Sequence, residues 1–356
     1  MLSFGITMQH SLFLALGGRG LDTAFDYGDK YQAEVGRAVA TSGLPRSAVF
    51  VTTKVPCCAS SFVKDDVYSN HCHARRSPEE TAADVAHDLS VLGMPFVDLL
   101  LMHWPCDSTA DTLATWRVLE RLALDGRARA IGVSNFNASA IESLLPHVKV
   151  RPAVNQVCAA AGLPASYIAI LPSHPALIRD SAWRAVRFQR RRPLWHPAQQ
   201  PRGGRRIPVF QPAGSRGHVV RRDATVSSGS IRCRCVARAP ALRLVSSTRR
   251  YRNQTWGRDD ATLAACRRHK ITLMAYSPLG SAAPGGVTRV LSDTNVRAVA
   301  AAHNRTAAAV ALRWLVQQGV PVVTQSDKKE HMVDDLEGVF SFELTDSEMA
   351  RLAAIR

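Results

Sequence analysis

The sequence lacks any apolar run long enough to cross a lipid bilayer, which takes roughly 20 consecutive apolar residues in a helix, so no membrane span is expected. It also lacks the basic segment that opens a secretion signal, and its early apolar run at residues 12–16 is short. These two absences predict a cytoplasmic protein with no membrane partner.

The eight cysteines lack the paired spacing of a zinc site, and in a chain of 356 residues they do not resemble the framework of a small disulfide-rich protein. We therefore expect free thiols in a reducing compartment. One cluster leaves two interpretations open, a metal site or a solvated loop with scattered thiols. Its members are Cys57, Cys58, His71, Cys72 and His73. The missing paired spacing favours the loop, and we assign no metal.

Residues 159–255 contain neither lysine nor glutamate. They carry 19 arginines against two acids, Asp180 and Asp223, whereas the whole chain has a formal net charge of +16. The remainder is thus close to neutral, as in an ordinary metabolic enzyme. The segment could be a basic arm that binds nucleic acid through phosphate contacts, or a non-native or disordered insertion, such as a translated intron. Its composition matches that of many disordered or artefactual tracts, which favours the insertion, so we expect no nucleic-acid partner.

The chain has no GxGxxG after a strand, which argues against a Rossmann domain. What it has instead is an alternation of short apolar runs with stretches of helical period, typical of a β/α barrel. The expected strands are residues 20–24, 49–54, 97–103, 130–134, 153–157, 271–276, 321–324 and 338–342. The expected helices are residues 31–42, 78–92, 112–125, 138–145, 259–270, 295–303 and 306–318. This pattern predicts a single α/β domain over residues 1–356, a (β/α)8 TIM barrel with the 159–255 insertion after the fifth strand.

Four polar residues lie at the ends of predicted strands: Asp22, Tyr27, Lys54 and His103. The carboxyl ends of barrel strands meet around one pocket, where such barrels keep their chemistry. A phenol is a poor acid at neutral pH unless a cation lies beside it, and Lys54 can be that cation. Asp22 would hold Lys54, and His103 could donate a hydrogen bond to a substrate oxygen. The set predicts protonation of a carbonyl oxygen by Tyr27.

Six motifs occur in one order along the chain: LDTAFDYGD, FVTTKV, LLLMHWP, IGVSNF, VNQ and AYSPLG. In this order the chain resembles the aldo-keto reductases. The resemblance implies a monomeric enzyme that reduces an aldehyde or ketone by hydride transfer from NAD(P)H, an alcohol dehydrogenase (NADP+)-like activity. It implies cofactor contacts from Ser134, Asn135, Gln156, Tyr276, Ser277, Leu279 and Ser326, and substrate contacts from His103 and Trp104.

The chain departs from the family pattern at the expected adenosine end of the cofactor. Gln325 and His331 stand where the family has a lysine and an arginine, and two cations that would grip a 2′-phosphate are therefore missing. NADPH remains the expected cofactor and NADH the alternative. The family's usual opening and closing segments are not visible either, so the resemblance implies shortened termini.

A barrel with these motifs need not turn over substrate. The alternative to the enzyme is a non-catalytic cofactor-binding barrel, either an auxiliary or sensor protein or the inactive product of a faulty gene model. The intact set of Asp22, Tyr27, Lys54 and His103 favours the enzyme.

Overall fold

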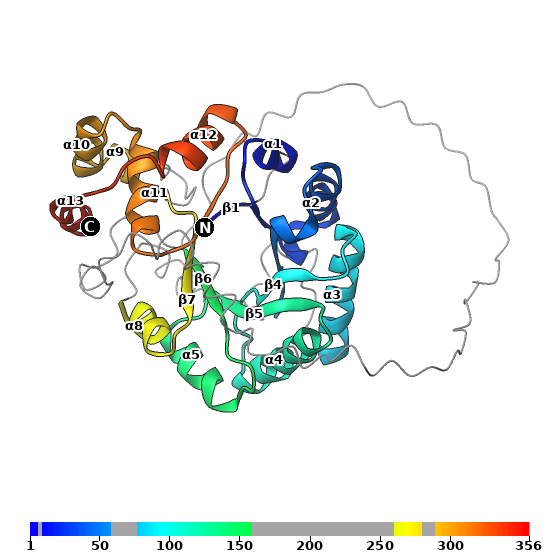
Figure 1. Cartoon of the computed structure of the whole chain (residues 1–356). Helices are drawn as coiled ribbons and strands as arrows, with labels where there is room; N and C mark the ends of the chain where they lie inside the picture. Colours follow the sequence, from blue (N-terminus) through cyan, green and yellow to red (C-terminus); the bar gives the residue numbers. More distant parts are fainter. Residues whose placement is uncertain (6–8, 58–76, 159–259, 280–288, 356) are drawn as a thin grey trace, which may run out of the picture. The chain divides into compact units, whose positions relative to one another are not determined.

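The computed structural model describes residues 1–5, 9–57, 77–158, 260–279 and 289–355. Within them, parallel strands pair in sequence order from β1 to β8, and β8 returns to β1 to close a barrel. Helices lie outside the strands (Figure 1). The strands are β1 (Leu2–Phe4), β2 (Gly20–Asp22), β3 (Phe50–Val55), β4 (Val97–Met102), β5 (Ala128–Ser134), β6 (Val154–Cys158), β7 (Thr272–Tyr276) and β8 (Val322–Thr324). The predicted (β/α)8 barrel is confirmed.

The helices follow the expected alternation, with several short elements in addition. The α-helices are α1 (His10–Ala15), α2 (Asp29–Thr41), α3 (Pro78–Leu92), α4 (Thr109–Leu124), α5 (Ala138–Leu144), α8 (Asp260–Arg268), α9 (Arg289–Ser292), α10 (Thr294–Ala302), α11 (Ala307–Gln317), α12 (Lys329–Val333) and α13 (Asp346–Ala353). Shorter turns are the 3-10 helices η1 (Phe25–Tyr27), η2 (Arg46–Ala48) and η3 (Leu145–His147) and the π-helical turn η6 (Asp334–Gly338). No helix in these ranges is both long and apolar enough to cross a membrane.

One predicted strand is wrong, and one real strand was missed. Residues 338–342 do not form a strand, because Asp334–Gly338 forms a π-helical turn and the amide of Val339 donates to the carbonyl of Asp334 at 3.0 Å. The strand that completes the set of eight is β1 at the start of the chain, whose three residues are too few to show an alternating pattern. The segment 159–255, which lies outside the described residues, therefore follows the sixth strand and not the fifth.

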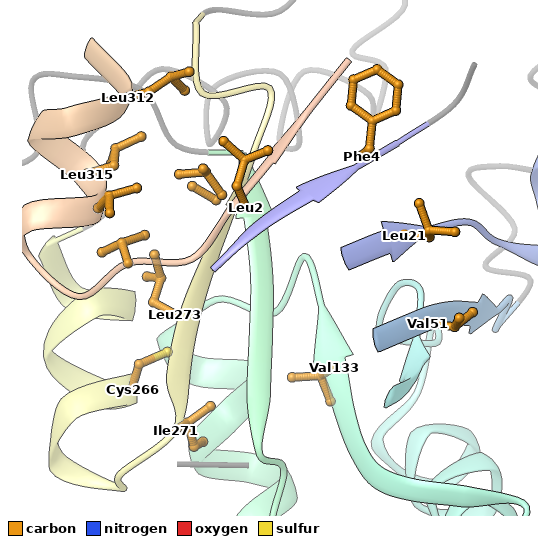
Figure 2. Close-up of a cluster of buried hydrophobic side chains, with 14 of the residues drawn as sticks. Leu2, Phe4, Leu21, Val51, Val133, Cys266, Ile271, Leu273, Leu312 and Leu315 are labelled. Carbon is orange, nitrogen blue, oxygen red and sulfur yellow. The ribbon is translucent and has the colours of Figure 1, made fainter. Parts of the chain in front are cut away.

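Alternation along the strands divides the buried side chains into two clusters. Outward-facing residues pack under the helices, and Figure 2 shows Leu21 on β2, Val51 on β3 and Leu273 on β7 among them. The inward cluster consists of Phe50, Leu99, Leu101, Ala130, Val154, Met274 and Val323. Since successive residues of a strand face opposite sides, the inward series that includes Phe50 continues to Lys54, at the carboxyl end of β3.

Close approach inside the barrel requires glycine at position 132 on β5. A Cβ there would lie 2.6 Å from the carbonyl oxygen of Val154 and 2.7 Å from Cδ2 of Leu101. Since real Cβ atoms do not approach other atoms so closely, any side chain would force β5 away from its neighbours. Ser134, two residues on, is thereby kept at the barrel mouth beside β6.

Candidate active site

A cavity of about 760 Å³ opens at the carboxyl ends of the strands, a size typical of small-molecule sites. Its wall includes Asp22, Tyr27, His103 and Trp104, and it extends to Ser326 and His331 after β8. Lys54 is not part of the wall and is 1% exposed. The structure thus brings the predicted residues together, with Lys54 behind Tyr27 and Asp22.

Lys54 contacts three oxygen atoms of the neighbouring strand β2 and of the segment that follows it. Its ammonium forms a buried ion pair with Asp22, and it donates to the carbonyl oxygen of Thr23 at 2.9 Å and to the hydroxyl of Tyr27 at 3.3 Å. The Tyr27 oxygen thus accepts a hydrogen bond from Lys54, and Tyr27 itself lines the cavity. A phenol donor backed by a cation is the arrangement of a general acid.

Two aromatic rings and one carboxylate hold His103 in place. Its ring packs edge-on against Tyr27 at 5.8 Å and stacks on Trp104 at 3.6 Å, centroid to centroid. Nδ1 lies 2.8 Å from Oδ2 of Asp26. Burial lowers the pKa of His103, although Asp26 opposes this change. We did not predict Asp26; the one available signal was a carboxylate directly before Tyr27 in the sequence AFDYG.

The amide and hydroxyl groups expected to contact the cofactor already form a network. Ser134 donates to the carbonyl oxygen of Gln156 at 2.8 Å, and Gln156 Nε2 donates to Oδ2 of Asp22 at 2.8 Å. Asn135 Nδ2 donates to the carbonyl oxygen of His103 at 3.0 Å, while its Oδ1 accepts from the hydroxyl of Tyr276 at 2.9 Å. The network fixes these side chains in one orientation at the cavity wall.

Two residues of this wall have left-handed backbone conformations although neither is glycine. Asn135 has φ 60° and Ser277 has φ 49°, in the region that disfavours most side chains. Both residues line the cavity, together with Tyr276 and Leu279. Such conformations persist where surrounding structure enforces them, and they cluster at functional sites.

The far end of the cavity is acidic. Ser326 hydrogen-bonds to Nδ1 of His331 at 3.2 Å, and three carboxylates complete this part of the wall. They are Asp327, Asp334 and Asp335. Burial raises the pKa of Asp335 to about 7. Gln325 lines the same end, so the two positions without the expected cations, 325 and 331, do face the cavity.

The prediction of free thiols is wrong for one pair. Cys57 and Cys106 form a disulfide with a Cα–Cα distance of 5.1 Å, and they lie 49 residues apart in the sequence. Each follows its strand closely, so that the bond joins the loop after β3 to the loop after β4. Sequence spacing could not reveal this pair, because neighbouring parallel strands bring distant residues together.

No group of three or more His, Cys, Asp and Glu side chains with a metal-binding arrangement occurs in the described ranges. The cysteine and histidine cluster considered in the sequence has one described member, Cys57, which forms the disulfide with Cys106. Its members Cys58, His71, Cys72 and His73 lie outside the described residues.

A dinucleotide would fit the residues of this cavity. One end offers a proton donor and a fixed amide network, the adjoining wall offers the flat ring of Tyr276, and the other end offers Ser326 and His331. Asn135 and Ser277, with their left-handed backbone conformations, belong to the same wall.

Comparison with known proteins gives one family. The model of the aldo/keto reductase family matches residues 7–160 and 224–356. An aldo-keto reductase of Mycolicibacterium smegmatis is 30% identical over 342 residues, 96% of this chain and 79% of the relative. A morphine 6-dehydrogenase of Pseudomonas putida is 27% identical over 346 residues, 95% of this chain and 79% of the relative. The solved structure of a Bombyx mori aldo-keto reductase in complex with NADP aligns with a TM-score of 0.62, at 19% identity, covering 99% of this chain and 87% of that one.

Proposed function

Because the chain belongs to the aldo/keto reductase family, we propose that it reduces an aldehyde or ketone to an alcohol, with Tyr27 as the general acid. The observation that carries this proposal is the contact of Lys54 with Tyr27 at the mouth of the barrel. The activity is of the alcohol dehydrogenase (NADP+) type. The morphine 6-dehydrogenase among the relatives, named for a dehydrogenase reaction, is consistent with alcohol and carbonyl chemistry.

The cofactor is a nicotinamide dinucleotide, which when bound supplies the hydride that the carbonyl carbon receives. Ser134, Asn135 and Gln156 would hold its carboxamide, and Tyr276 would stack on its ring. Ser277 and Leu279 would line its pyrophosphate, and Ser326 its adenosine end. All seven residues line the cavity, which supports these assignments.

The protein's own residues would act on the substrate oxygen. Tyr27 delivers its hydroxyl proton to that oxygen as negative charge develops there, and the ammonium of Lys54, which donates to the Tyr27 oxygen at 3.3 Å, stabilises the phenolate left behind. Asp22 keeps Lys54 in place. His103 and Trp104 form the substrate wall.

NADPH is our proposed reductant, in line with the NADP held by the Bombyx mori protein. A specific observation favours NADH as the second candidate. Gln325 and His331 line the far end of the cavity beside the carboxylates of Asp327, Asp334 and Asp335. Ionised carboxylates repel a phosphate, and Gln325 carries no charge that would attract it.

A turnover assay tests the proposal against a non-catalytic barrel. Purified protein is given NADPH or NADH and a broad aldehyde such as a nitrobenzaldehyde, and cofactor consumption and cofactor fluorescence are followed together. Consumption that depends on the aldehyde supports the enzyme. A change in fluorescence without consumption identifies a protein that only binds the cofactor, and it overturns the proposal.

A further inference from the structure

Asp26 and His103 form a buried pair that links the turn of Tyr27 to the end of β4. Oδ2 of Asp26 lies 2.8 Å from Nδ1 of His103, and the two side chains are 0% and 6% exposed. Asp26 belongs to η1, the turn that also carries Tyr27. The position of the His103 ring and that of the Tyr27 hydroxyl therefore depend on one short turn.

The pair dictates where the proton of this hydrogen bond lies. The other oxygen of Asp26, Oδ1, is buried and has no hydrogen-bond partner in the described part of the chain. A buried carboxylate with an unpaired oxygen is costly, and His103 is the partner that offsets part of that cost. Because a carboxylate only accepts hydrogen bonds, the proton belongs on Nδ1 of His103.

This tautomer determines what His103 offers to a ligand. With Nδ1 committed to Asp26, the remaining ring nitrogen, Nε2, is the one left for a molecule in the cavity that His103 lines. In a neutral imidazole Nε2 is then an acceptor, and in the imidazolium it is a donor. A carbonyl oxygen needs a donor, whereas an alcohol hydroxyl can donate to an acceptor.

We propose that Asp26 is a positioning residue: by holding the proton on Nδ1 of His103, it makes the preference of the cavity for alcohol or carbonyl depend on the charge of His103. Neutral His103 favours the alcohol, and the imidazolium favours the carbonyl. The inference rests on the proposed function of the same cavity and adds a specificity element to it.

The charged and titratable groups that face His103 from the described elements are Asp26 and Tyr27 on η1, Asp22 on β2 and Lys54 on β3. Burial lowers the pKa of His103 most, the hydrogen bond and charge of Asp26 raise it, Lys54 lowers it and Asp22 raises it, and the net change is downward. The neutral, accepting form is therefore the main form near pH 7. Carbonyl reduction should accordingly become less efficient as the pH rises through the pKa of His103.

Asp26→Asn separates tautomer from charge, because the new amide can donate to Nδ1 and so move the imidazole proton to Nε2. In the unaltered protein, kcat/KM for a carbonyl should fall about tenfold per pH unit above the pKa of His103. In Asp26→Asn this dependence should flatten, since neutral His103 can now donate. Efficiency of alcohol oxidation should fall in the variant, since the acceptor is lost.

The matched control is Asp29→Asn, because Asp29 contacts His87 at the same 2.8 Å but on the surface, outside the cavity. Nitrogen-15 NMR of labelled histidine, without cofactor, reads the tautomer directly. The His103 signal is identified among twelve histidines by its disappearance in His103→Gln.

At pH 8 we expect a protonated Nδ1 and a bare Nε2 in the unaltered protein and in Asp29→Asn, and the reverse in Asp26→Asn. A protonated Nε2 with a bare Nδ1 in the unaltered protein overturns the inference even if Asp26→Asn does not fold. Unchanged pH profiles in a folded Asp26→Asn overturn it as well. Failure of the proposed function would instead appear as an absence of turnover with the tautomer unaffected.

Discussion

The ammonium of Lys54 lies 3.3 Å from the hydroxyl oxygen of Tyr27, and the same ammonium pairs with Asp22. Lys54 is 1% exposed and does not line the cavity. It can therefore act on the substrate through Tyr27, and its charge is balanced by the carboxylate of Asp22, which Gln156 also contacts.

Lys54→Met should be strongly destabilising because it leaves Asp22 as an uncompensated buried charge, a loss of about 3–5 kcal/mol in the free energy of unfolding. Adding Asp22→Asn removes that charge and should restore much of the stability, although not the activity. Urea unfolding of the single and double variants measures the difference. A double variant no more stable than Lys54→Met would show that the pair is not the source of the loss.

Asp88 on α3 should make stability depend on pH. Gln32 and Thr53 donate to it at 2.7 and 2.8 Å, yet burial raises its pKa to about 7 from 3.8. Between these two pKa values the folded state keeps a proton on Asp88 that the unfolded state has lost. The free energy of unfolding is therefore highest, as far as Asp88 is concerned, below pH 3.8, and it falls as the pH rises to about 7.

Asp88→Asn removes this titration, so the variant should gain stability relative to the unaltered protein from pH 4.5 to 8, by up to roughly 4 kcal/mol. The free energy of unfolding in urea, measured across this range, gives the difference. Asp125→Asn, at an exposed residue, is the control, and its free energy of unfolding should change with pH as that of the unaltered protein does. If the free energy of unfolding of Asp88→Asn showed the same pH dependence as that of the unaltered protein, the raised pKa of Asp88 would be contradicted.

The disulfide between Cys57 and Cys106 should stabilise the loops that follow β3 and β4. Reduction, or Cys57→Ser with Cys106→Ser, should lower the free energy of unfolding by about 2–4 kcal/mol, because the unfolded chain regains loop entropy. Cys266→Ala, at a buried cysteine outside the disulfide, is the control, and the stability of this variant should remain sensitive to reductant. Identical unfolding curves with and without reductant would show that the bond is absent or contributes nothing.

Gln325→Lys should discriminate between the two candidate cofactors. A cation at this end of the cavity gains a charge-assisted contact only with the 2′-phosphate, so the Kd for NADPH should fall about tenfold or more while that for NADH changes little. Fluorescence titration of both cofactors measures this, with Gln325→Met as the uncharged control. Equal gains for both cofactors would place residue 325 away from the phosphate.

The barrel, and the meeting of its polar strand-end residues around one cavity, could be predicted because strand ends carry local signals. Helix α3 was predicted with the bounds that it has, since Pro78 and two glutamates open it, and the structure adds a capping box between Ser77 and Glu80. Strand β1 escaped detection because three residues show no period. Residues 338–342 were misread because their apolar character belongs to a turn that buries Val339.

The sequence did not predict two contacts between residues that are far apart along the chain. Asp26 and His103 are 77 residues apart, and Cys57 and Cys106 are 49 apart. Each pair forms only because the barrel brings together loops at the same end of its strands. The contact of Tyr27 with Lys54, by contrast, could be expected in advance, because a phenol that is to donate a proton at neutral pH needs a cation beside it.

The most direct test of the account is Tyr27→Phe, which removes one hydroxyl and leaves the ring in the cavity wall. With NADPH and a nitrobenzaldehyde, kcat should fall by about 10²–10⁴-fold, while the Kd for NADPH by fluorescence stays within about twofold of its original value, because no assigned cofactor contact is lost. Tyr31→Phe on α2, outside the cavity, should retain full activity. Normal turnover by Tyr27→Phe would contradict the role of Tyr27 as the general acid.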